Sequence, residues 1–291
     1  MSHSNPYFSP GIYGEAISAA EYHADTLCPQ PSLSSSIARL LCGSSPLHAW
    51  YAHPCLNLNY RPESAELLDI GSIAHALLLE GVDRAEVLEF PDWRTGASKE
   101  AREKARLDGK IPILRKHWGD VSKMIQTAVI QLKAHYLTID ARDSEQTLIW
   151  KEDDIWCRAR LDNLFLEVNP RILDYKTTSA TANPDVVSRT LFQNGYDIQA
   201  AWYRRGVKAL TGIEPDFKFI YQETYPPYAL SVIALGPDAL MLAEKRVLFA
   251  LETWKRCLDS GKWPGYPART CEVTQAPKYL EDAWTWKELR V

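Results

Sequence analysis

Two carboxylates and one amine lie close together in the middle of the sequence. Asp162 ends the run Arg-Ala-Arg-Leu-Asp, and Asp174 and Lys176 follow after the pair Asn169-Pro170. This pair is typical of a turn, so the segment predicts a β-hairpin. With the turn centred near Asn169, Asp162 would lie opposite Lys176 and Leu164 opposite Asp174. The three polar groups would then share one face of the sheet, whereas a shift of one residue would separate them.

Such a group is costly to bury in an apolar strand unless it binds a ligand. Carboxylate oxygens suit Mg²⁺, and Mn²⁺ is expected to substitute for it. A metal ion held there would stabilise charge on a scissile phosphate and lower the pKa of a bound water, while Lys176 would orient that water or help to deprotonate it. The pattern therefore favours phosphodiester hydrolysis. The alternative is a salt-bridged surface pair of Asp174 and Lys176.

Two helical patterns carry further polar side chains. Gly71 precedes His75 by one turn on an otherwise apolar helix, and Gln199 precedes Tyr203 by one turn on another. Gly71 would permit another backbone or a ligand to approach that helix closely. The alternatives are a hydrogen-bonded core histidine and a surface hydrogen-bond pair.

The order of these four motifs is informative. A Gly-x-x-x-His helix, an Asp that closes a strand, an Asp-Tyr-Lys strand and a Gln-x-x-x-Tyr helix resemble the signature of the RecB-like branch of PD-(D/E)XK nucleases, although Leu161 replaces the proline that names the family. The resemblance implies a restriction-endonuclease-like core, in which a mixed central sheet is flanked by helices. It also implies that Lys176 is the catalytic lysine and that Gln199 and Tyr203 organise the site or contact DNA. The implied metal ligands are His75, Asp162, Asp174 and the backbone carbonyl of Tyr175.

Within that branch, residues 20 to 225 are most similar to the RecE (exonuclease VIII) group of phages and prophages. The similarity includes Glu21-Tyr22-His23, the serines after Ser32, the block from Arg94 to Pro112, and Ser144-Glu145 before a strand. It implies a 5′-to-3′ exonuclease on double-stranded DNA ends, which leaves single-stranded 3′ tails for recombination. It further implies a ring-shaped homo-oligomer, such as a tetramer, and a RecT-like single-strand annealing protein as partner. The alternatives are a Cas4-like or RecB-like single-strand nuclease and a catalytically silent DNA-binding module.

The charge distribution is informative only locally. The net charge of −4 does not indicate a polyanion partner, but the segment from Trp93 to Lys123 holds nine Lys and Arg against four Asp and Glu. This segment is either an ordinary solvated helix or a surface that binds the DNA backbone. Glu145 is a candidate for the surroundings of the metal or for a second metal ion. The residues expected to contact DNA are Arg94, Lys99, Arg102, Lys110, Thr177 and Thr178.

The hydrophobic pattern favours one domain of mixed α/β class over residues 1–291. We expect an irregular N-terminal arm over 1–30, a helical part over 31–140, the catalytic sheet and helix over 141–235, and a C-terminal helix with a Trp-rich tail over 236–291. In the catalytic part, strands are expected near 146–150, 155–168, 171–176, 217–223 and 228–234. Long helices are expected over 65–80, 98–107, 119–136, 185–210 and 238–260.

The remaining composition bears on cofactors and location. Six cysteines are scattered without a Cys-x-x-Cys pair, so we expect reduced structural thiols and no iron–sulfur cluster. No segment has the roughly 18 consecutive apolar residues of a membrane span, and the N-terminus lacks a secretory pattern. We therefore expect a protein of the bacterial cytoplasm that does not enter a membrane.

Overall fold

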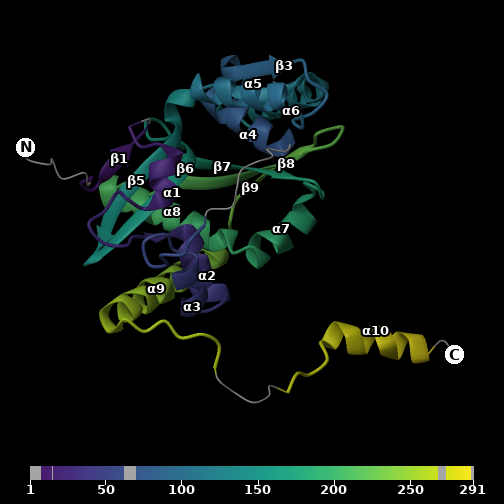
Figure 1. The fold of residues 1–291 in the computed structure, drawn as a ribbon. Helices are drawn as coiled ribbons and strands as arrows, with labels where there is room; N and C mark the ends of the chain where they lie inside the picture. Colours follow the sequence, from purple (N-terminus) through teal and green to yellow (C-terminus); the bar gives the residue numbers. More distant parts are fainter. Residues whose placement is uncertain (1–7, 15, 62–69, 268–272, 290–291) are drawn as a thin grey trace, which may run out of the picture.

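The computed structural model describes residues 8–14, 16–61, 70–267 and 273–289. Within these residues a seven-stranded mixed sheet runs in the order β1-β5-β6-β7-β8-β9, with β2 added beside β6 (Figure 1). The expected mixed α/β core with a central sheet flanked by helices is confirmed. The strands of this sheet are β1 (Gly11–Tyr13), β2 (Leu33–Ser34), β5 (Ser144–Glu152), β6 (Ile155–Phe165), β7 (Arg171–Thr178), β8 (Asp216–Glu223) and β9 (Leu230–Ile233).

Helices cover both faces of the sheet. One face packs against α2 (Ser35–Gly43), α8 (Tyr196–Thr211) and α9 (Pro237–Ser260), in a core that includes Trp150, Trp202 and Trp254. On the other side lie α4 (Ile70–Glu80) and α6 (Arg115–Ala134), together with α5 (Gly96–Leu107) and the small parallel pair β3 (Ala85–Leu88) and β4 (Ile111–Leu114) (Figure 1). The sheet is thus enclosed between two helical layers, which is the usual way to bury parallel strand pairs such as β7 and β8.

The β6–β7 hairpin forms with a different register from the expected one. Asn163 pairs with Leu173 and Leu164 with Ile172, so the extended register would set Asp162 opposite Asp174 rather than Lys176. The prediction is therefore wrong by two residues. The turn is centred nearer position 168, and Asn169 takes a left-handed backbone conformation within it (φ 56°). A shift of two residues keeps the period-two alternation of a strand, which is why the polar groups are still brought together.

The helix expected over 185–210 is two helices. The structure has α7 (Pro184–Gln193), then a break, then α8. Gly195 adopts φ 65° at this break, a left-handed conformation that ends one helix and lets the chain turn into the next. The helix expected from residue 65 is described from Ile70 as α4, and positions 65–69 lie outside the described residues.

The N-terminal segment is more regular than the expected arm. β1 pairs with β5 at one edge of the sheet, and α1 (Ala19–Ala24) follows. The side chain of Ser18 accepts a hydrogen bond from the backbone of Glu21, whose carboxylate accepts one from Ser18 in return. This capping box is a helix start signal that sequence reasoning could have used.

The C-terminal segment after α9 divides into a packed and an exposed part. Trp263 packs edge-on against Trp254, and the ring of Tyr266 lies 5.3 Å from that of His48, next to α3 (Pro46–Tyr51). Beyond residue 272, α10 (Lys278–Glu288) lies apart from the body, with every residue exposed (Figure 1). None of the helices in the described part of the chain has the length and apolar character required to span a membrane.

Candidate metal and nucleic-acid site

The site is centred where β6 and β7 separate. Their ladder holds the three pairs from Asn163–Leu173 to Phe165–Arg171 and ends one residue before Asp162 and Asp174. β7 continues beside β8, while β6 continues beside β5. At the fork, the backbone N–H of Tyr175 donates to Oδ2 of Asp162 at 2.8 Å. A carboxylate thus replaces the missing ladder partner, and the fork holds two acidic side chains next to each other.

His75, on helix α4, contacts Asp162 at the fork. Its Nε2 lies 3.2 Å from Oδ2 of Asp162, and its ring lies 5.6 Å from that of Tyr175. Burial lowers the pKa of His75, but the hydrogen bond and the negative charge of Asp162 outweigh it and raise the pKa. The helix can come this close because a Cβ at Gly71 would lie 2.5 Å from Oγ1 of Thr177 on β7. A close approach does occur at Gly71, but the groups that approach are the side chains of Thr177 and Thr224 and not the expected backbone or ligand.

Asp174 is fully buried on the side of the sheet that α8 covers. Its Oδ2 forms an ion pair with the ammonium of Lys176, and its Oδ1 accepts a hydrogen bond from the Gln199 amide at 2.8 Å. The same amide donates to the hydroxyl of Tyr203 at 3.0 Å. Gln199 and Tyr203 are one turn apart on α8 and point at the site, so the predicted pairing across one helical face is confirmed.

The two acids differ in their proton affinity. Burial raises the pKa of Asp174 to about 6, although the neighbouring Lys176 opposes this shift. Burial also raises the pKa of Asp162, but the hydrogen bond and charge of His75, with the charge of Lys176, outweigh it and leave that pKa lowered. For Lys176, the two carboxylates outweigh burial and raise its pKa. At neutral pH Lys176 is therefore charged and can donate hydrogen bonds.

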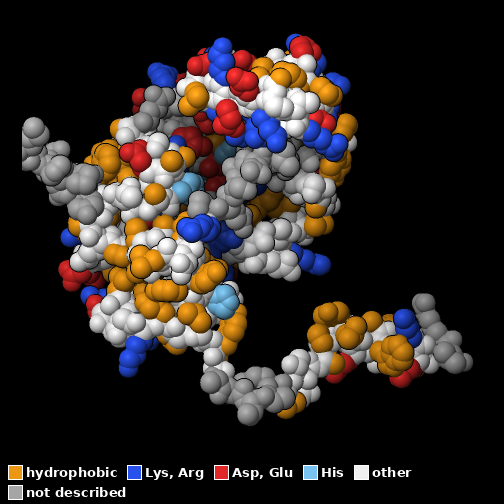
Figure 2. All heavy atoms as spheres, viewed as in Figure 1, with side chains coloured by type: hydrophobic (Ala, Val, Ile, Leu, Met, Phe, Trp, Pro, Cys, Tyr) orange, Lys and Arg blue, Asp and Glu red, His pale blue; other side chains and the backbone are white. Residues whose placement is uncertain are grey.

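A cleft of about 410 Å³ opens beside this group. Figure 2 shows acidic side chains deep in a hollow between the α4–α6 helices and the rest of the body. Besides Asp162, Lys176, Gln199 and Tyr203, the lining includes side chains that the sequence analysis did not assign to the site, namely Tyr22, His23, Ser35, Ser36, Arg39, Arg160 and Tyr196. Arg160 could have been found, because it is two residues before Asp162 on a strand and so lies on the same face. The others come from segments distant in sequence.

Glu145 also lines the cleft, next to Arg160. Its Oε2 accepts from the Arg160 guanidinium at 2.6 Å, and its backbone takes φ 54°, a left-handed conformation that is uncommon for a residue with a side chain. Burial raises its pKa, although the charge of Arg160 lowers it. Glu145 is thus held in a strained position within the candidate site, as outliers at functional sites often are.

Comparison with known proteins identifies the family. The sequence matches the model of a PDDEXK-like domain of unknown function (DUF3799) over residues 49–277, which is most of the chain. The chain belongs to this PDDEXK-like family. No curated protein sequence matches it.

One solved structure shares the fold of this chain. A crystal structure from Eubacterium rectale named "Putative exonuclease" superposes with a TM-score of 0.58 at 14% identity, covering 93% of this chain and 98% of that one. A second structure, of a phage-related exonuclease from Haemophilus somnus 129PT, matches at 14% identity over 65% of this chain and 95% of that one, with a TM-score of only 0.32. At these identities the likeness shows the fold, and the chemistry must be argued from the site.

The donor set of this PDDEXK-like chain fits a hard divalent cation. Asp174 is fully buried and the Asp162 side chain is 16% exposed, and both carboxylates lie at the fork. Oδ2 of Asp174 is buried and forms an ion pair with Lys176. Such an arrangement needs positive charge to be stable. The ligand atoms of His75, Asp162 and Asp174 do not all lie within 4.8 Å of one another, so the structure shows them as two pairs, His75 with Asp162 and Lys176 with Asp174. These residues and the carbonyl of Tyr175 are the groups that could hold the ion.

The residues expected to contact DNA lie in different surroundings. Arg94, Lys99 and Arg102 line a second cleft, of about 680 Å³, between α5 and α6. The ammonium of Lys110 donates to the carbonyl of Asp83 at 2.9 Å, so it ties two loops of the helical layer together. The hydroxyl of Thr178 accepts from the backbone N–H of Ala180. The Thr177 hydroxyl faces Gly71. DNA contact by these six residues stays a prediction.

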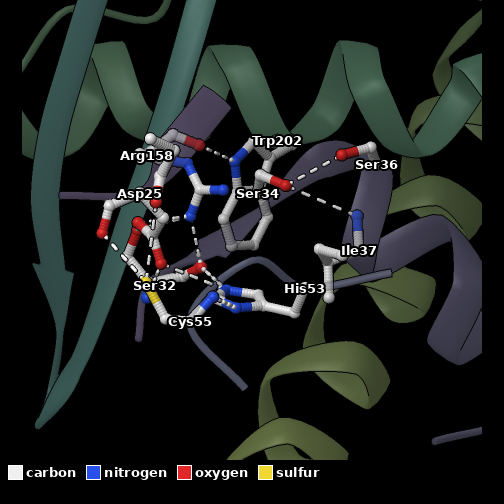
Figure 3. A network of polar contacts seen from close by, with 10 residues as sticks. Asp25, Ser32, Ser34, Ser36, Ile37, His53, Cys55, Arg158 and Trp202 are labelled. Carbon is white, nitrogen blue, oxygen red and sulfur yellow. Dashed lines mark hydrogen bonds and ion pairs between the residues drawn. The ribbon is translucent and has the colours of Figure 1, made fainter. Parts of the chain in front are cut away.

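A second polar cluster lies in the interior, between the N-terminal segment and β6. Among the residues that the structure describes, Asp25, His53 and Cys55 are the one group of three whose ligand atoms fall within 4.8 Å. Figure 3 shows the Asp25 carboxylate facing Arg158, Ser32 and His53. Nη1 of Arg158 lies 2.6 Å from Oδ1 of Asp25. On His53, Nδ1 accepts a hydrogen bond from the backbone N–H of Cys55, and Nε2 contacts the carbonyl of Ser32. Arg158 already supplies the positive charge and both imidazole nitrogens are used, so this is a structural network.

Proposed function

We propose that this chain is a metal-dependent deoxyribonuclease that degrades linear double-stranded DNA from its ends in the 5′-to-3′ direction and leaves 3′ single strands for recombination. The observation that carries the nuclease proposal is the placement of Asp162, Asp174 and Lys176 at the β6–β7 fork. The PDDEXK-like family and fold support it. The end specificity and the direction rest on the resemblance of the sequence motifs to the RecE group.

The proposed chemistry follows from the groups at the fork. Mg²⁺, or Mn²⁺ in its place, would be held by His75, Asp162, Asp174 and the Tyr175 carbonyl, and when bound it would offset charge on the scissile phosphate and lower the pKa of a water. Lys176 is charged and 21% exposed, so its ammonium can contact both that water and a phosphate oxygen.

Other side chains have positioning roles in this proposal. Gln199 fixes the rotation of the Asp174 carboxylate through the 2.8 Å hydrogen bond, and Tyr203 fixes Gln199. Arg39 and Arg160 line the cleft, where guanidinium groups suit the neighbouring phosphates of a DNA strand.

The test is digestion of linear duplex DNA that is labelled separately at its 5′ and 3′ ends. Mg²⁺ or EDTA is added, and wild type is compared with Lys176→Ala. We expect metal-dependent release of 5′ mononucleotides, with loss of activity in the variant. Release from single-stranded DNA alone would favour a Cas4-like or RecB-like single-strand nuclease. No cleavage with any divalent metal would support a catalytically silent DNA-binding module and contradict the proposal.

The proposal extends to partners. A ring-shaped homo-oligomer, such as a tetramer, would enclose the duplex, and a RecT-like annealing protein would receive the 3′ strand in the bacterial cytoplasm. Light scattering coupled to size-exclusion chromatography measures the number of chains in the oligomer. Co-purification with the annealing protein of the same replicon tests the partnership. A monomer at micromolar concentration would contradict the ring.

A further inference from the structure

The second cleft differs in kind from the cleft at the fork. It lies in the helical layer between α5, the loop before it and the start of α6, with a volume of about 680 Å³. Basic side chains dominate its wall, with Asp92 as the acidic residue of the lining and an aromatic ring among them. The basic side chains are Arg94, Lys99, Arg102, Arg106, Lys116 and His117.

An aromatic and apolar surface lies among these cations. Trp93 is half-buried, and the Arg102 guanidinium lies 5.6 Å from the centroid of its ring. Ile73, Pro112 and Leu114 are buried residues that complete the apolar part of the lining. Alternating phosphate-binding cations and a flat aromatic face are what a single strand requires, since its bases are free to stack. A duplex keeps its bases stacked inside and offers only phosphates and groove edges.

Helix α4 contacts both the fork and the basic cleft. His75 points to Asp162 at the fork, whereas Ile73 lines the basic cleft. Two residues along an α-helix differ by about 200° in direction, so these side chains leave opposite faces of the same helix. A nucleic acid that reaches the fork would therefore have a second, separate binding surface one helix away.

We propose that the basic cleft binds the strand that is not cleaved, in its unpaired form, while the other strand of the duplex enters the fork. This inference rests on the proposed function, because it assigns a place to the strand that an exonuclease leaves behind. Helix α4 would then separate the two strands. Phosphates contact Lys99 and Lys116, and a base stacks on Trp93.

The experiment measures binding of a fluorescein-labelled oligothymidine by anisotropy, with EDTA to prevent cleavage. The double variant Lys99→Ala/Lys116→Ala is expected to weaken binding about tenfold or more, and to reduce the slope of log Kd against log salt by about 0.7 for each lost phosphate contact. Trp93→Leu is expected to weaken it by about fivefold or more. The matched control is Lys133→Ala/Lys245→Ala, which removes two exposed charges, on α6 and α9, outside the cleft and should leave binding within about twofold of wild type.

Three results would overturn the inference. The first is wild-type affinity of the cleft variant for oligothymidine. The second is a loss of affinity in the control variant as large as that in the cleft variant. The third is a cleft variant that loses as much affinity for a blunt duplex as for oligothymidine, which would make the cleft a duplex contact. Binding in EDTA does not depend on catalysis. If Lys176→Ala and wild type are both inactive in the digestion assay, the proposed function fails even where the oligothymidine data agree. If digestion succeeds and the cleft variant binds normally, only the cleft assignment fails.

Discussion

The side-chain amide of Gln199 donates one hydrogen to Asp174 Oδ1 at 2.8 Å and another to the Tyr203 hydroxyl at 3.0 Å. Both hydrogens of the amide are therefore used, and Asp174 is held with its other oxygen toward Lys176. All of these groups except the ammonium are nearly or fully buried. A buried hydrogen bond to a carboxylate is strong and directional, so α8 determines how Asp174 faces the fork.

Gln199→Leu should impair catalysis without unfolding the protein. Loss of a residue that orients a metal-binding carboxylate typically reduces metal affinity or activity by about 10- to 100-fold. We expect a reduction of this size in Mg²⁺-dependent cleavage of end-labelled duplex, measured at several Mg²⁺ concentrations. Tyr203→Phe should have a smaller effect, because the bond to Asp174 remains. Equal activity of Gln199→Leu and wild type, at unchanged thermal stability, would show that Gln199 does not position the acid.

Gly71→Ala should reduce cleavage by separating α4 from β7. The added Cβ would lie 2.5 Å from Thr177 Oγ1 and 3.0 Å from Thr224 Cγ2, so the helix must shift and carry His75 away from Asp162. Displacements near 1 Å at a catalytic site can cost about 10²-fold in rate. The assay is the same duplex digestion, with circular dichroism to confirm the fold.

Gly119→Ala is the matched control for that variant. Gly119 lies within α6, and a Cβ there meets no atom within 4 Å. The substitution should be neutral for cleavage and should stabilise the helix by about 1 kcal/mol. If Gly119→Ala lowered activity as much as Gly71→Ala, the close approach to Thr177 would not be the cause.

These contacts show what the sequence could predict. Alternation along β7 and the one-turn spacing on α8 indicated which side chains face one another, since both depend on local geometry alone. The exact hairpin register was wrong because it depends on where the turn is centred, and Asn169 is one of several residues near the turn that can adopt a left-handed conformation. The helix-forming pattern likewise continues through 185–210, so it predicted one helix and missed the break at Gly195.

The rest of the site depends on distant segments. Ser35 and Arg39 reach the cleft from α2, and Tyr22 reaches it from α1 in a segment expected to be irregular. The Asp25–Arg158 ion pair joins residues that are far apart in sequence. The hydrophobic periodicity of a sequence does not predict such contacts, because they are created by the packing of whole elements on the sheet.

Asp25→Asn should destabilise the fold through the buried network. The change leaves the Arg158 guanidinium buried without its counter-charge, which typically costs about 3–5 kcal/mol. Burial raises the pKa of Asp25, but the His53 hydrogen bond and the Arg158 charge outweigh it, so the folded pKa is lowered from 3.8. The stabilisation is therefore complete above about pH 4 and is lost as pH falls below it.

Urea denaturation at a series of pH values tests this. The difference in free energy of unfolding between wild type and Asp25→Asn should be constant from neutral pH to about pH 5 and should shrink below about pH 4. A difference that stays constant down to pH 2 would show that packing, and not the carboxylate charge, accounts for the loss.

Asp174→Asn should separate stability from metal binding. The folded pKa of Asp174, about 6, lies above its ordinary 3.8, so the ionised carboxylate costs stability above pH 6, and that cost is relieved as pH falls toward 4. In EDTA at pH 8 the variant should therefore be at least as stable as wild type, while Lys176 keeps the attraction of Asp162. Mg²⁺ should raise the Tm of wild type and have less effect on the variant. An equal Mg²⁺ shift in both proteins would remove Asp174 from the ligand set.

Removal of residues 268–291 should leave the stability of the body almost unchanged. Trp263 and Tyr266 are retained in this truncation, and with them the contacts to Trp254 and His48 that fix the start of the tail. The residues of α10 are exposed, including Trp284 (62%) and Trp286 (67%), so its loss removes little buried apolar surface. We expect the free energy of unfolding to change by less than about 1 kcal/mol, measured in urea at low protein concentration. A larger loss that grows with protein concentration would instead show that α10 packs between copies of the chain, since oligomerisation contributes to stability by mass action.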